Sequence, residues 1–389
     1  CSKERMDKRA QDKASGTLYD DLFIRHWDTW KDGTRSQLFV ASLGADGKAG
    51  HPGWVSKGLN GDVPPKPFGG DEAFTFDDDG SHIIFTLRDA DAGLEALSTN
   101  LDLWRAPVDG SSAPVNLTTG NPASDSTPVV SPDGKTLAYL AMSRAKYEAD
   151  RQRILLRDLE SGEIRELAPE WDRSPGSLAF SSDGKTLYVT ADDRGQHPLF
   201  AIAGDNGGVR KLPQTGYVSG FTVGKNRIIY AFDDLRSPVD LYRMDAGGGN
   251  VRRLTYSNTA RLKNIGLGEF EQFSFYGAGN DVVYGFVVKP WNYAPGETYP
   301  VAFIIHGGPQ GSMGNHWHYR WNPQTYAGAG YAAVFIDFHG STGYGQAFTD
   351  AIRGDWGGKP LEDLQKGLKS ALAKYDWLDG ERVCALGAS

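Results

Sequence analysis

Cysteine is almost absent from this chain of 389 residues, which holds only Cys1 and Cys384. Two cysteines that far apart do not make a disulfide framework, and no Cys/His cluster has the spacing of zinc ligands. His316 and His318 invite a metal-site interpretation, but no third ligand lies near them in the sequence, and metal sites need three or four. We therefore expect neither a bound metal nor another cofactor.

Positive charge of the kind that binds nucleic acid is also lacking. The 41 Lys and Arg residues are outnumbered by 49 Asp and Glu, which gives a net charge of −8, whereas nucleic-acid binding needs clustered Lys and Arg. Long apolar runs are missing too, since runs such as Tyr331–Ile336 are far shorter than the roughly 20 residues of a membrane span. Gly340–Gly345 matches neither nucleotide-binding glycine motif. The sequence therefore argues against a nucleic-acid partner, a membrane span and a nucleotide site.

Glycine and proline, in contrast, are plentiful, with 49 and 20 residues, which favours turns and short strands over long helices. Three segments share one pattern, an Asp-Gly turn between two alternating apolar strands, which is a strong hairpin signal. Their turns begin at Asp79, Asp133 and Asp183, so they repeat at intervals of 54 and 50 residues. A degraded fourth copy spans residues 223–231. The chain therefore contains an internal repeat.

A second element follows each hairpin: Leu beside another large apolar residue, a short polar turn, and a strand that ends near Leu. Its copies span residues 103–117, 155–167, 199–212 and 241–254, with an incomplete copy at Leu38–Phe39. Four strands per unit of about 45 residues are typical of a β-propeller blade, and a β-sandwich with similar hairpins is the alternative. We assign residues 1–265 to an incomplete propeller, of which about four to five blades are visible and the N-terminal blades are missing.

The pattern changes after about residue 265. Two strands that read as a hairpin are followed by strand, helix, strand, helix and strand. These elements are expected at residues 269–276, 281–288, 300–305, 321–329, 331–337, 360–372 and 382–386. Such a βαβ series predicts an α/β domain with a parallel sheet, and we assign residues 266–389 to it.

Two loops at strand ends carry the candidate chemistry. His306–Gly311 follows the strand that ends at Ile305, and its paired glycines let backbone N–H groups approach a ligand, as in an oxyanion hole; an ordinary Gly-Pro turn is the alternative. Gly387–Ser389 supplies the first three positions of a G-x-S-x-G nucleophile elbow. The two loops are placed like the oxyanion loop and the nucleophile of an α/β-hydrolase. The sequence therefore predicts the N-terminal part of an α/β-hydrolase domain with Ser389 as nucleophile.

At these residues the sequence resembles the prolyl oligopeptidase family of serine peptidases, and within it the acylaminoacyl-peptidase and dipeptidyl-peptidase V branch. The resemblance covers essentially the whole chain and is more specific in the hydrolase part than in the blades. The motifs that carry it are His306–Gly311, Asp337–Gln346, Asp355–Gly358, Gly387–Ser389, Arg25–Trp30 and Tyr147–Arg151.

The resemblance implies a propeller of about seven or eight blades that caps the hydrolase domain and admits only small peptides. It implies that Ser389 attacks the substrate carbonyl and that the amide of Gly308, with Gly307 beside it, donates to the oxyanion. His306 stands where related dipeptidyl peptidases carry an oxyanion Tyr. The Asp and His of the triad follow the nucleophile in the hydrolase order, so no residue of this chain is assigned to either role. We therefore expect the chain as written to be inactive.

A resemblance to dipeptidyl peptidases also implies buried carboxylates that hold the free amino group of the substrate, since a charged pair is strong only when desolvated. Glu148 and Asp150, next to Arg151, are the candidates; in the alternative, Arg151 pairs with one of them in a solvated loop. The expected function is the release of dipeptides from oligopeptides through an acyl-enzyme on Ser389. The alternatives are an acylaminoacyl-peptidase that acts on N-blocked peptides and a propeller binding module with a degenerate hydrolase domain.

The first residue is Cys1 rather than Met, and charged residues follow it where a signal peptide would be apolar. We expect that residue 1 is not the translation start and is either the mature Cys of a lipoprotein or the start of a chain cut from a longer parent. The family branch is usually periplasmic or secreted, and a cytoplasmic location is the alternative. The expected partners are short peptides, with a homodimer as a further option.

Overall fold

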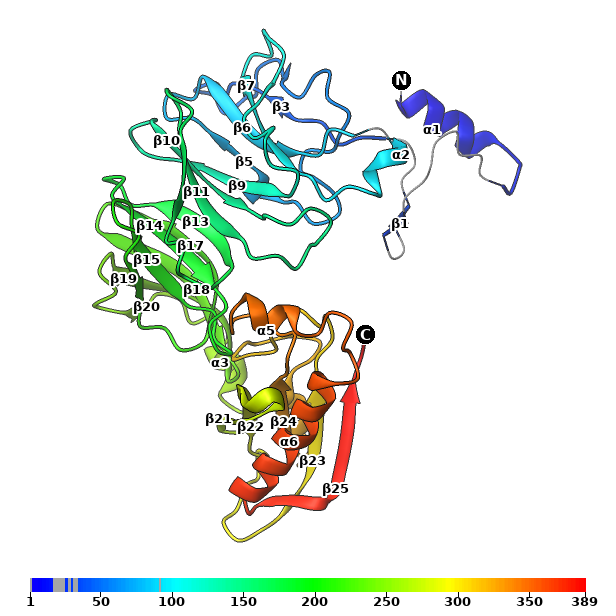
Figure 1. The fold of residues 1–389 in the computed structure, drawn as a ribbon, viewed down its shortest axis with the longest axis vertical. Helices are drawn as coiled ribbons and strands as arrows, with labels where there is room; N and C mark the ends of the chain where they lie inside the picture. The colour runs from blue at the N-terminus through cyan, green and yellow to red at the C-terminus, as the bar shows by residue number, and fades with distance from the viewer. Residues whose placement is uncertain (1, 17–24, 27–28, 31–33, 91) are drawn as a thin grey trace. The chain divides into compact units, whose positions relative to one another are not determined.

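The chain forms two compact units, and Figure 1 shows its helices and strands, coloured along the chain. The first comprises residues 1–148 and 155–164, and the second comprises residues 149–154 and 165–389. The computed structural model describes residues 2–16, 25–26, 29–30, 34–90 and 92–389. Positions 27 and 28 of the Arg25–Trp30 motif therefore lie outside the described residues. The domain boundary expected near residue 265 falls within the second unit and stays a prediction.

The first unit begins with a helix and two small two-stranded sheets, which precede a four-stranded antiparallel sheet. The early elements are α1 (Ser2–Gln11), β1 (Arg25–His26), β2 (Thr29–Trp30), β3 (Phe39–Val40) and β4 (Gly53–Trp54). The larger sheet has the order β5-β6-β7-β8, formed by β5 (Phe74–Phe76), β6 (His82–Leu87), β7 (Asp102–Pro107) and β8 (Val115–Asn116). Ile83, Phe85 and Leu87 alternate along β6 and form its core with Val55 and Val63.

Three further four-stranded sheets repeat the same order of neighbouring strands. Their strands are β9 (Asp125–Val130), β10 (Thr136–Ala141), β11 (Arg153–Asp158), β12 (Ile164–Leu167), β13 (Pro175–Phe180), β14 (Thr186–Ala191), β15 (Leu199–Ala203), β16 (Val209–Lys211), β17 (Tyr217–Val223), β18 (Arg227–Asp234), β19 (Ser237–Asp245) and β20 (Arg252–Arg253). The four sheets confirm the predicted blade repeat. No sheet among the described residues closes on itself, as fits an incomplete propeller.

Two of the Asp-Gly turns are built by the same hydrogen bonds. In the β9–β10 turn, Ser131 Oγ donates to Asp133 Oδ1 at 2.6 Å and accepts the N–H of Thr136 at 2.9 Å. In the β13–β14 turn, Ser181 and Asp183 make the first of these bonds at the same distance. The glycine after each Asp has a φ of 70°, a conformation that glycine adopts without strain. Each turn is therefore complete within a few residues of sequence.

The last sheet has five strands in the order β21-β22-β24-β23-β25. They are β21 (Phe270–Tyr276), β22 (Val282–Val288), β23 (Tyr299–Ile305), β24 (Ala332–Asp337) and β25 (Leu378–Gly387). β23 pairs in parallel with β24 and β25, whereas β22 pairs antiparallel with β21 and β24. The predicted hairpin β21–β22 and the predicted parallel pairing of β23, β24 and β25 are confirmed. The hairpin also pairs with the edge of β24, which was not predicted and makes the sheet mixed.

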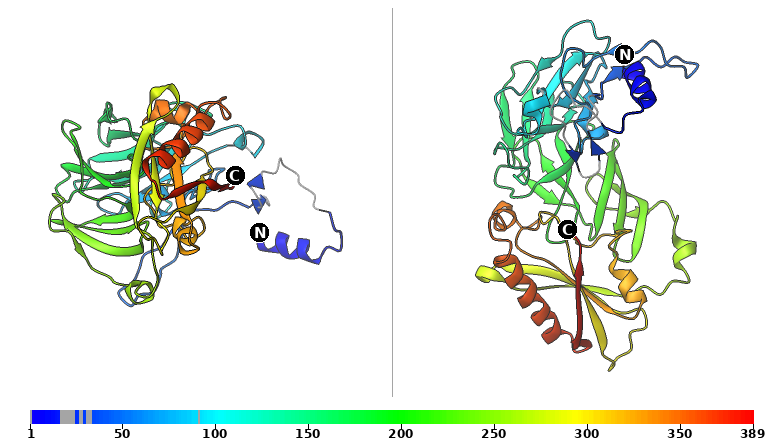
Figure 2. Two further views of the ribbon diagram at one scale, coloured as in Figure 1. Left: turned by 90° about the horizontal axis from the view of Figure 1, so that it is seen from below. Right: turned by 90° about the vertical axis from the view of Figure 1, so that its right-hand side faces the viewer.

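Helices cover both faces of this mixed sheet. On one face, Leu364 and Leu368 of α6 (Lys359–Lys374) pack against Val334 and Ile336 of β24. On the other face, Ala327 of α4 (Pro323–Gly328) packs with Ala333 and Phe335. Figure 2 shows α6, in orange-red, running along the sheet that ends in β25. The remaining short helices are η1 (Asp71–Ala73), α2 (Ala92–Glu95), α3 (Thr259–Leu262), η2 (Ala278–Asn280) and α5 (Gln346–Asp350).

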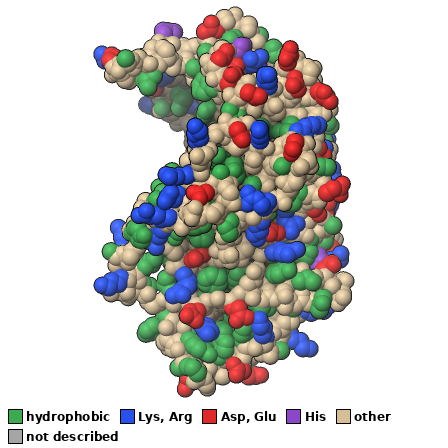
Figure 3. All heavy atoms as spheres, turned by 90° about the vertical axis from the view of Figure 1, so that its left-hand side faces the viewer, with side chains coloured by type: hydrophobic (Ala, Val, Ile, Leu, Met, Phe, Trp, Pro, Cys, Tyr) green, Lys and Arg blue, Asp and Glu red, His purple; other side chains and the backbone are tan. Residues whose placement is uncertain are grey.

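The surface carries charge of both signs. On the face that Figure 3 shows, acidic and basic side chains both occur, and neither sign covers the face. Within the described part of the chain, none of the helices combines the length and the apolar character that crossing a membrane requires. The thiol of Cys384 on β25 is free and exposed.

Candidate active site

The two candidate loops begin at the same edge of the mixed sheet. β23 and β25 are parallel neighbours, and Ile305 is paired with Gly387 at their carboxyl ends. Because ligands of α/β sheets bind beyond the carboxyl ends of the strands, this edge is where a site is expected. The loop after β23, residues 306–322, is called the β23 loop below, and residues 338–345 form the β24 loop.

The glycines of the two loops allow a close approach that a side chain would prevent. A Cβ atom placed on Gly387 would overlap the carbonyl oxygen of Ile305. A Cβ atom on Gly307 would lie 2.6 Å from the carbonyl oxygen of Ala388 and 3.1 Å from Cβ of Ser389. The structure therefore brings the predicted oxyanion residue Gly307 and the predicted nucleophile Ser389 together.

Ser389 has the backbone of a strained turn. Its φ is 72°, in the left-handed region that residues with a side chain rarely adopt. A nucleophile elbow imposes such a turn so that the serine hydroxyl stands clear of the sheet, and Ser389 is exposed. Gly308, the second predicted oxyanion residue, has a φ of 125°. The catalytic roles of Ser389, Gly307 and Gly308 stay predictions.

His306 is engaged by both of its ring nitrogens. Nδ1 lies 2.9 Å from the carbonyl oxygen of Gly307, and Nε2 lies 3.0 Å from Oγ of Ser341. Because a carbonyl oxygen only accepts hydrogen bonds, Nδ1 carries the proton and donates it. The ring also stacks on Phe338, with centroids 4.4 Å apart. His306 therefore holds the β23 loop to the β24 loop and is not aimed at Ser389.

A buried carboxylate at the end of β24 fixes the next part of the β23 loop. Asp337 accepts hydrogen bonds from the Ser312 hydroxyl at 2.5 Å, the Met313 N–H at 3.2 Å and the Tyr344 hydroxyl at 2.8 Å. Burial raises the pKa of Asp337, and Nε2 of His306 lies 3.7 Å away. Sequence reasoning missed this anchor. The signal available in the sequence was an Asp at the end of a strand whose other residues are all apolar.

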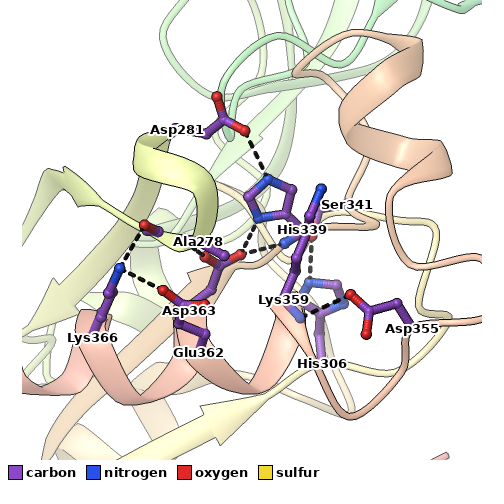
Figure 4. A network of polar contacts seen from close by, with 11 residues as sticks. Ala278, Asp281, His306, His339, Ser341, Asp355, Lys359, Glu362, Asp363 and Lys366 are labelled. Atoms are coloured by element: carbon purple, nitrogen blue, oxygen red, sulfur yellow. Dashed lines mark hydrogen bonds and ion pairs between the residues drawn. The ribbon is translucent and has the colours of Figure 1, made fainter.

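A second buried network stands behind the β24 loop (Figure 4). Asp363 of α6 accepts Nδ1 and the backbone N–H of His339, at 2.6 and 2.7 Å, and also the N–H of Ala278 at 2.7 Å. Nε2 of His339 lies 3.2 Å from Asp281. Since both ring nitrogens face carboxylates, which only accept, the doubly protonated imidazolium fits this position. Burial acts to lower the pKa of His339, but the hydrogen bonds and charges of Asp363 and Asp281 outweigh it and raise that pKa.

The three predicted substrate-binding residues have different surroundings. Glu148 is exposed and belongs to the first unit, whereas Asp150 and Arg151 belong to the second. Arg151 forms an ion pair with Glu166 at 3.2 Å and donates to the carbonyl oxygens of Pro169 and Trp171. Arg151 is therefore held within its own blade. Asp150 is buried, and the substrate-binding role of all three residues stays a prediction.

The two histidines that suggested a metal pair have structural partners. Nδ1 of His316 lies 2.8 Å from Asp233 of β18. Nδ1 of His318 accepts the backbone N–H groups of Arg320 and Trp321 at 3.1 and 3.0 Å, so that nitrogen is unprotonated. Burial, followed by the positive charges nearby, lowers the pKa of His318. The two side chains therefore shape the β23 loop.

Known proteins match both the sequence and the fold. The sequence profile of the prolyl oligopeptidase family matches residues 317–389. A probable dipeptidyl-peptidase 5 of Arthroderma benhamiae is 35% identical over 396 aligned residues, which cover 97% of this chain and 54% of that protein. The chain thus spans about half the length of the curated relatives it matches.

Solved structures share the architecture at lower identity. The acylaminoacyl peptidase of Pyrococcus horikoshii superposes with a TM-score of 0.67 at 23% identity, over 80% of this chain and 47% of that chain. A puromycin-hydrolyzing peptidase of Mycobacterium tuberculosis gives a TM-score of 0.60 at 18% identity, over 95% and 65%. The fold is therefore an incomplete β-propeller followed by the N-terminal part of an α/β-hydrolase domain. With the sequence matches, it follows that the chain belongs to the prolyl oligopeptidase family.

Proposed function

We propose that the full-length protein is a serine peptidase that releases dipeptides from the free N-terminus of short peptides. The observation that carries this proposal is the close approach of the Gly307 backbone to Ser389 at the ends of adjacent parallel strands. The 35% identity to the dipeptidyl-peptidase 5 of A. benhamiae supports the substrate class. The family's periplasmic or secreted location is proposed with it.

In the proposed reaction, the Ser389 hydroxyl attacks the peptide carbonyl and expels the amine, and water then hydrolyses the acyl-enzyme to release the dipeptide. The N–H of Gly308 stabilises the negative charge on the carbonyl oxygen, a donor role worth about 10²- to 10³-fold in kcat. His306 contributes by orientation. Its Nδ1–H binds the carbonyl oxygen of Gly307, and in a trans peptide the N–H of Gly308 points the opposite way. The histidine thereby aims the oxyanion donor.

We propose further that the isolated 389-residue chain does not hydrolyse peptides. A serine hydroxyl without a base is a poor nucleophile. In the described part of the chain, no histidine is hydrogen-bonded to Oγ of Ser389, and both ring nitrogens of His306 have other partners.

The test compares the full-length protein with its Ser389→Ala variant on a dipeptidyl naphthylamide with a free amino group and on the N-acetylated form. We expect hydrolysis of the free-amine substrate and a loss of at least about 10³-fold in Ser389→Ala. Activity retained in Ser389→Ala would show that the nucleophile is wrong. Ser389-dependent hydrolysis by the isolated 389-residue chain would show that the base lies within it.

The second candidate is an acylaminoacyl-peptidase, which the TM-score of 0.67 to the P. horikoshii enzyme favours. Preference for the N-acetylated substrate in the same assay would establish it. A Glu148→Gln variant of the full-length protein separates the two further. If Glu148 holds a free amino group, KM for free-amine substrates rises, and KM for N-acetylated substrates stays constant. No turnover of either substrate would favour a binding module.

A further inference from the structure

The β23 loop is anchored to the blades formed by β13–β16 and by β17–β20, as well as to its own sheet. Asn315 is buried; its N–H donates to the carbonyl oxygen of Gly195 at 2.7 Å, and its side chain accepts the N–H of Leu235 at 3.0 Å. The next residues bind Asp233, which accepts Nδ1 of His316 at 2.8 Å and the Trp317 N–H at 2.7 Å. All of these residues belong to the second unit.

The Asp233 carboxylate is buried, and the β23 loop supplies the two hydrogen-bond donors just described. The Asp233 side chain is fully buried, and both donors bind one oxygen, while the other oxygen has no hydrogen-bond partner. Removing one partner of a buried charge leaves the charge uncompensated, which costs more than an exposed bond. The pairing with His316 and Trp317 is therefore strongly favoured over an open arrangement.

The β24 loop is held by the same end of the blades. Asp192, which follows β14, accepts the Thr342 hydroxyl at 2.6 Å and lies 2.7 Å from Nδ1 of His197. The Arg194 N–H donates to the carbonyl oxygen of Gly343 at 3.1 Å. Between the two loops, the Thr342 N–H donates to the carbonyl oxygen of Gly311 at 3.1 Å. The blades therefore bind both loops that meet at the candidate site.

A stack of three rings joins the two blade carboxylates. Tyr217, at the start of β17, lies between His197 and His316, with ring centroids 4.5 and 4.0 Å away. In space, each residue contacts the next in the order Asp192, His197, Tyr217, His316 and Asp233. Burial and the two carboxylates raise the pKa of Tyr217 to about 12, so the phenol stays neutral between them. The stack sets the spacing of the points to which both loops are fixed.

We propose that His316 and Asp233 are positioning residues for the peptidase reaction, acting through the β23 loop on the Gly307–Gly308 peptide. This inference rests on the proposed function. With Ser312 and Met313 bound to Asp337, the loop is fixed at two places beyond Gly308. Loss of the His316 anchor lets the oxyanion donor shift, and a shift of about 1 Å near a reacting group costs about 100-fold in rate.

The kinetic test uses the full-length protein and three variants. His316→Ala removes the donor to Asp233, whereas His316→Asn keeps an N–H close to the position of Nδ1. We expect His316→Ala to lower kcat by about 10- to 100-fold with KM within about twofold, and His316→Asn to restore most of kcat. The matched control is Asp240→Asn in the same blade. Asp240 is equally buried, but its partners Arg253, Thr255 and Ser257 are near it in sequence, so kcat stays at the wild-type value.

A second measurement separates this inference from the proposed function. Amide hydrogen exchange on the 389-residue chain follows residues 306–317, with β22 as internal reference. Faster exchange of that segment in His316→Ala and Asp233→Asn, but not in Asp240→Asn, supports the inference even if the full-length protein has no peptidase activity. Unchanged exchange in the two variants, or an equal fall of kcat in His316→Ala and His316→Asn, would overturn it.

Discussion

The blade turns and the two loops of the candidate site are stabilised over very different distances along the chain. In the β9–β10 turn, Ser131 binds residues two and five positions away. In the β24 loop, Thr342 binds Asp192, 150 positions away, and in the β23 loop His316 binds Asp233, 83 positions away. The turns thus form from local sequence alone, whereas the loops take their shape only when blades and sheet are both folded.

This difference indicates which residues are most sensitive to substitution. In a local turn such as that at Asp133 the carboxylate is exposed, so water replaces a hydrogen bond that the carboxylate loses. A buried long-range carboxylate such as Asp363 or Asp233 loses a partner that water does not replace, so the full desolvation cost appears. Carboxylates of the same type should therefore contribute unequally to stability, according to whether they are exposed with local partners or buried with distant ones.

The largest effect is expected at Asp363. Asp363→Asn leaves the His339 imidazolium buried and presents an amide N–H₂ to one of two backbone donors. Breaking a buried pair in this way costs about 3–5 kcal/mol, measured as the loss of unfolding free energy in urea. The control is Asp281→Asn, because Asp281 contacts the same ring from an exposed position and is worth about 0–1 kcal/mol. Equal losses in the two variants would contradict the comparison.

The same contrast explains what could be predicted from the sequence. The hairpins were predictable because Ser131, Asp133 and Thr136 complete their bonds within six residues. The place of the candidate site was predictable as well, since Gly307 and Ser389 follow parallel strands. Asp233 and Asp363 were not predictable, because their partners lie 24 to 85 positions away and meet them only through the packing of blade on sheet and helix on sheet.

The pairing of the hairpin β21–β22 with the parallel strands was not predicted, for a related reason. β22 is buried on both faces over most of its length, so its apolar pattern resembles that of the parallel strands. A continuous apolar run does not indicate which strand a given strand pairs with, or whether the pairing is parallel or antiparallel. The pairing of β22 with β24 depends on a free strand edge elsewhere in the chain, which local sequence does not encode.

An intermediate effect is expected from pH. The pKa of His339 is raised in the folded chain, so its contribution to stability is fully present below the unfolded value of about 6.5 and is lost as the pH rises through the folded pKa. Urea midpoints measured between about pH 6 and about pH 9 should therefore fall with pH. The fall should flatten in Asp363→Asn, where the partner charge is gone. A wild-type profile as flat as that of the variant would refute the role of the imidazolium.

The smallest effect is expected in the blade turns, and it should be the same in both units. Ser131→Ala and Ser181→Ala each remove the hydroxyl that bridges the turn Asp and the following Thr. Water replaces the bond to the exposed Asp, so each variant should lower the unfolding free energy in urea denaturation by about 0.5–1.5 kcal/mol, the net worth of one ordinary hydrogen bond.

Ser131 and Ser181 lie in different compact units. Equal losses of unfolding free energy in the two variants would therefore show that the loss comes from the turn and not from its surroundings. Since hydrogen bonds lower the pKa of Asp133 and Asp183, the turns lose stability only as the pH falls through those lowered values. They therefore contribute nothing to the slope expected from His339. If Ser131→Ala and Ser181→Ala differed by more than about 1.5 kcal/mol, the turns would depend on distant packing after all, and the contrast with the β23 and β24 loops would fail.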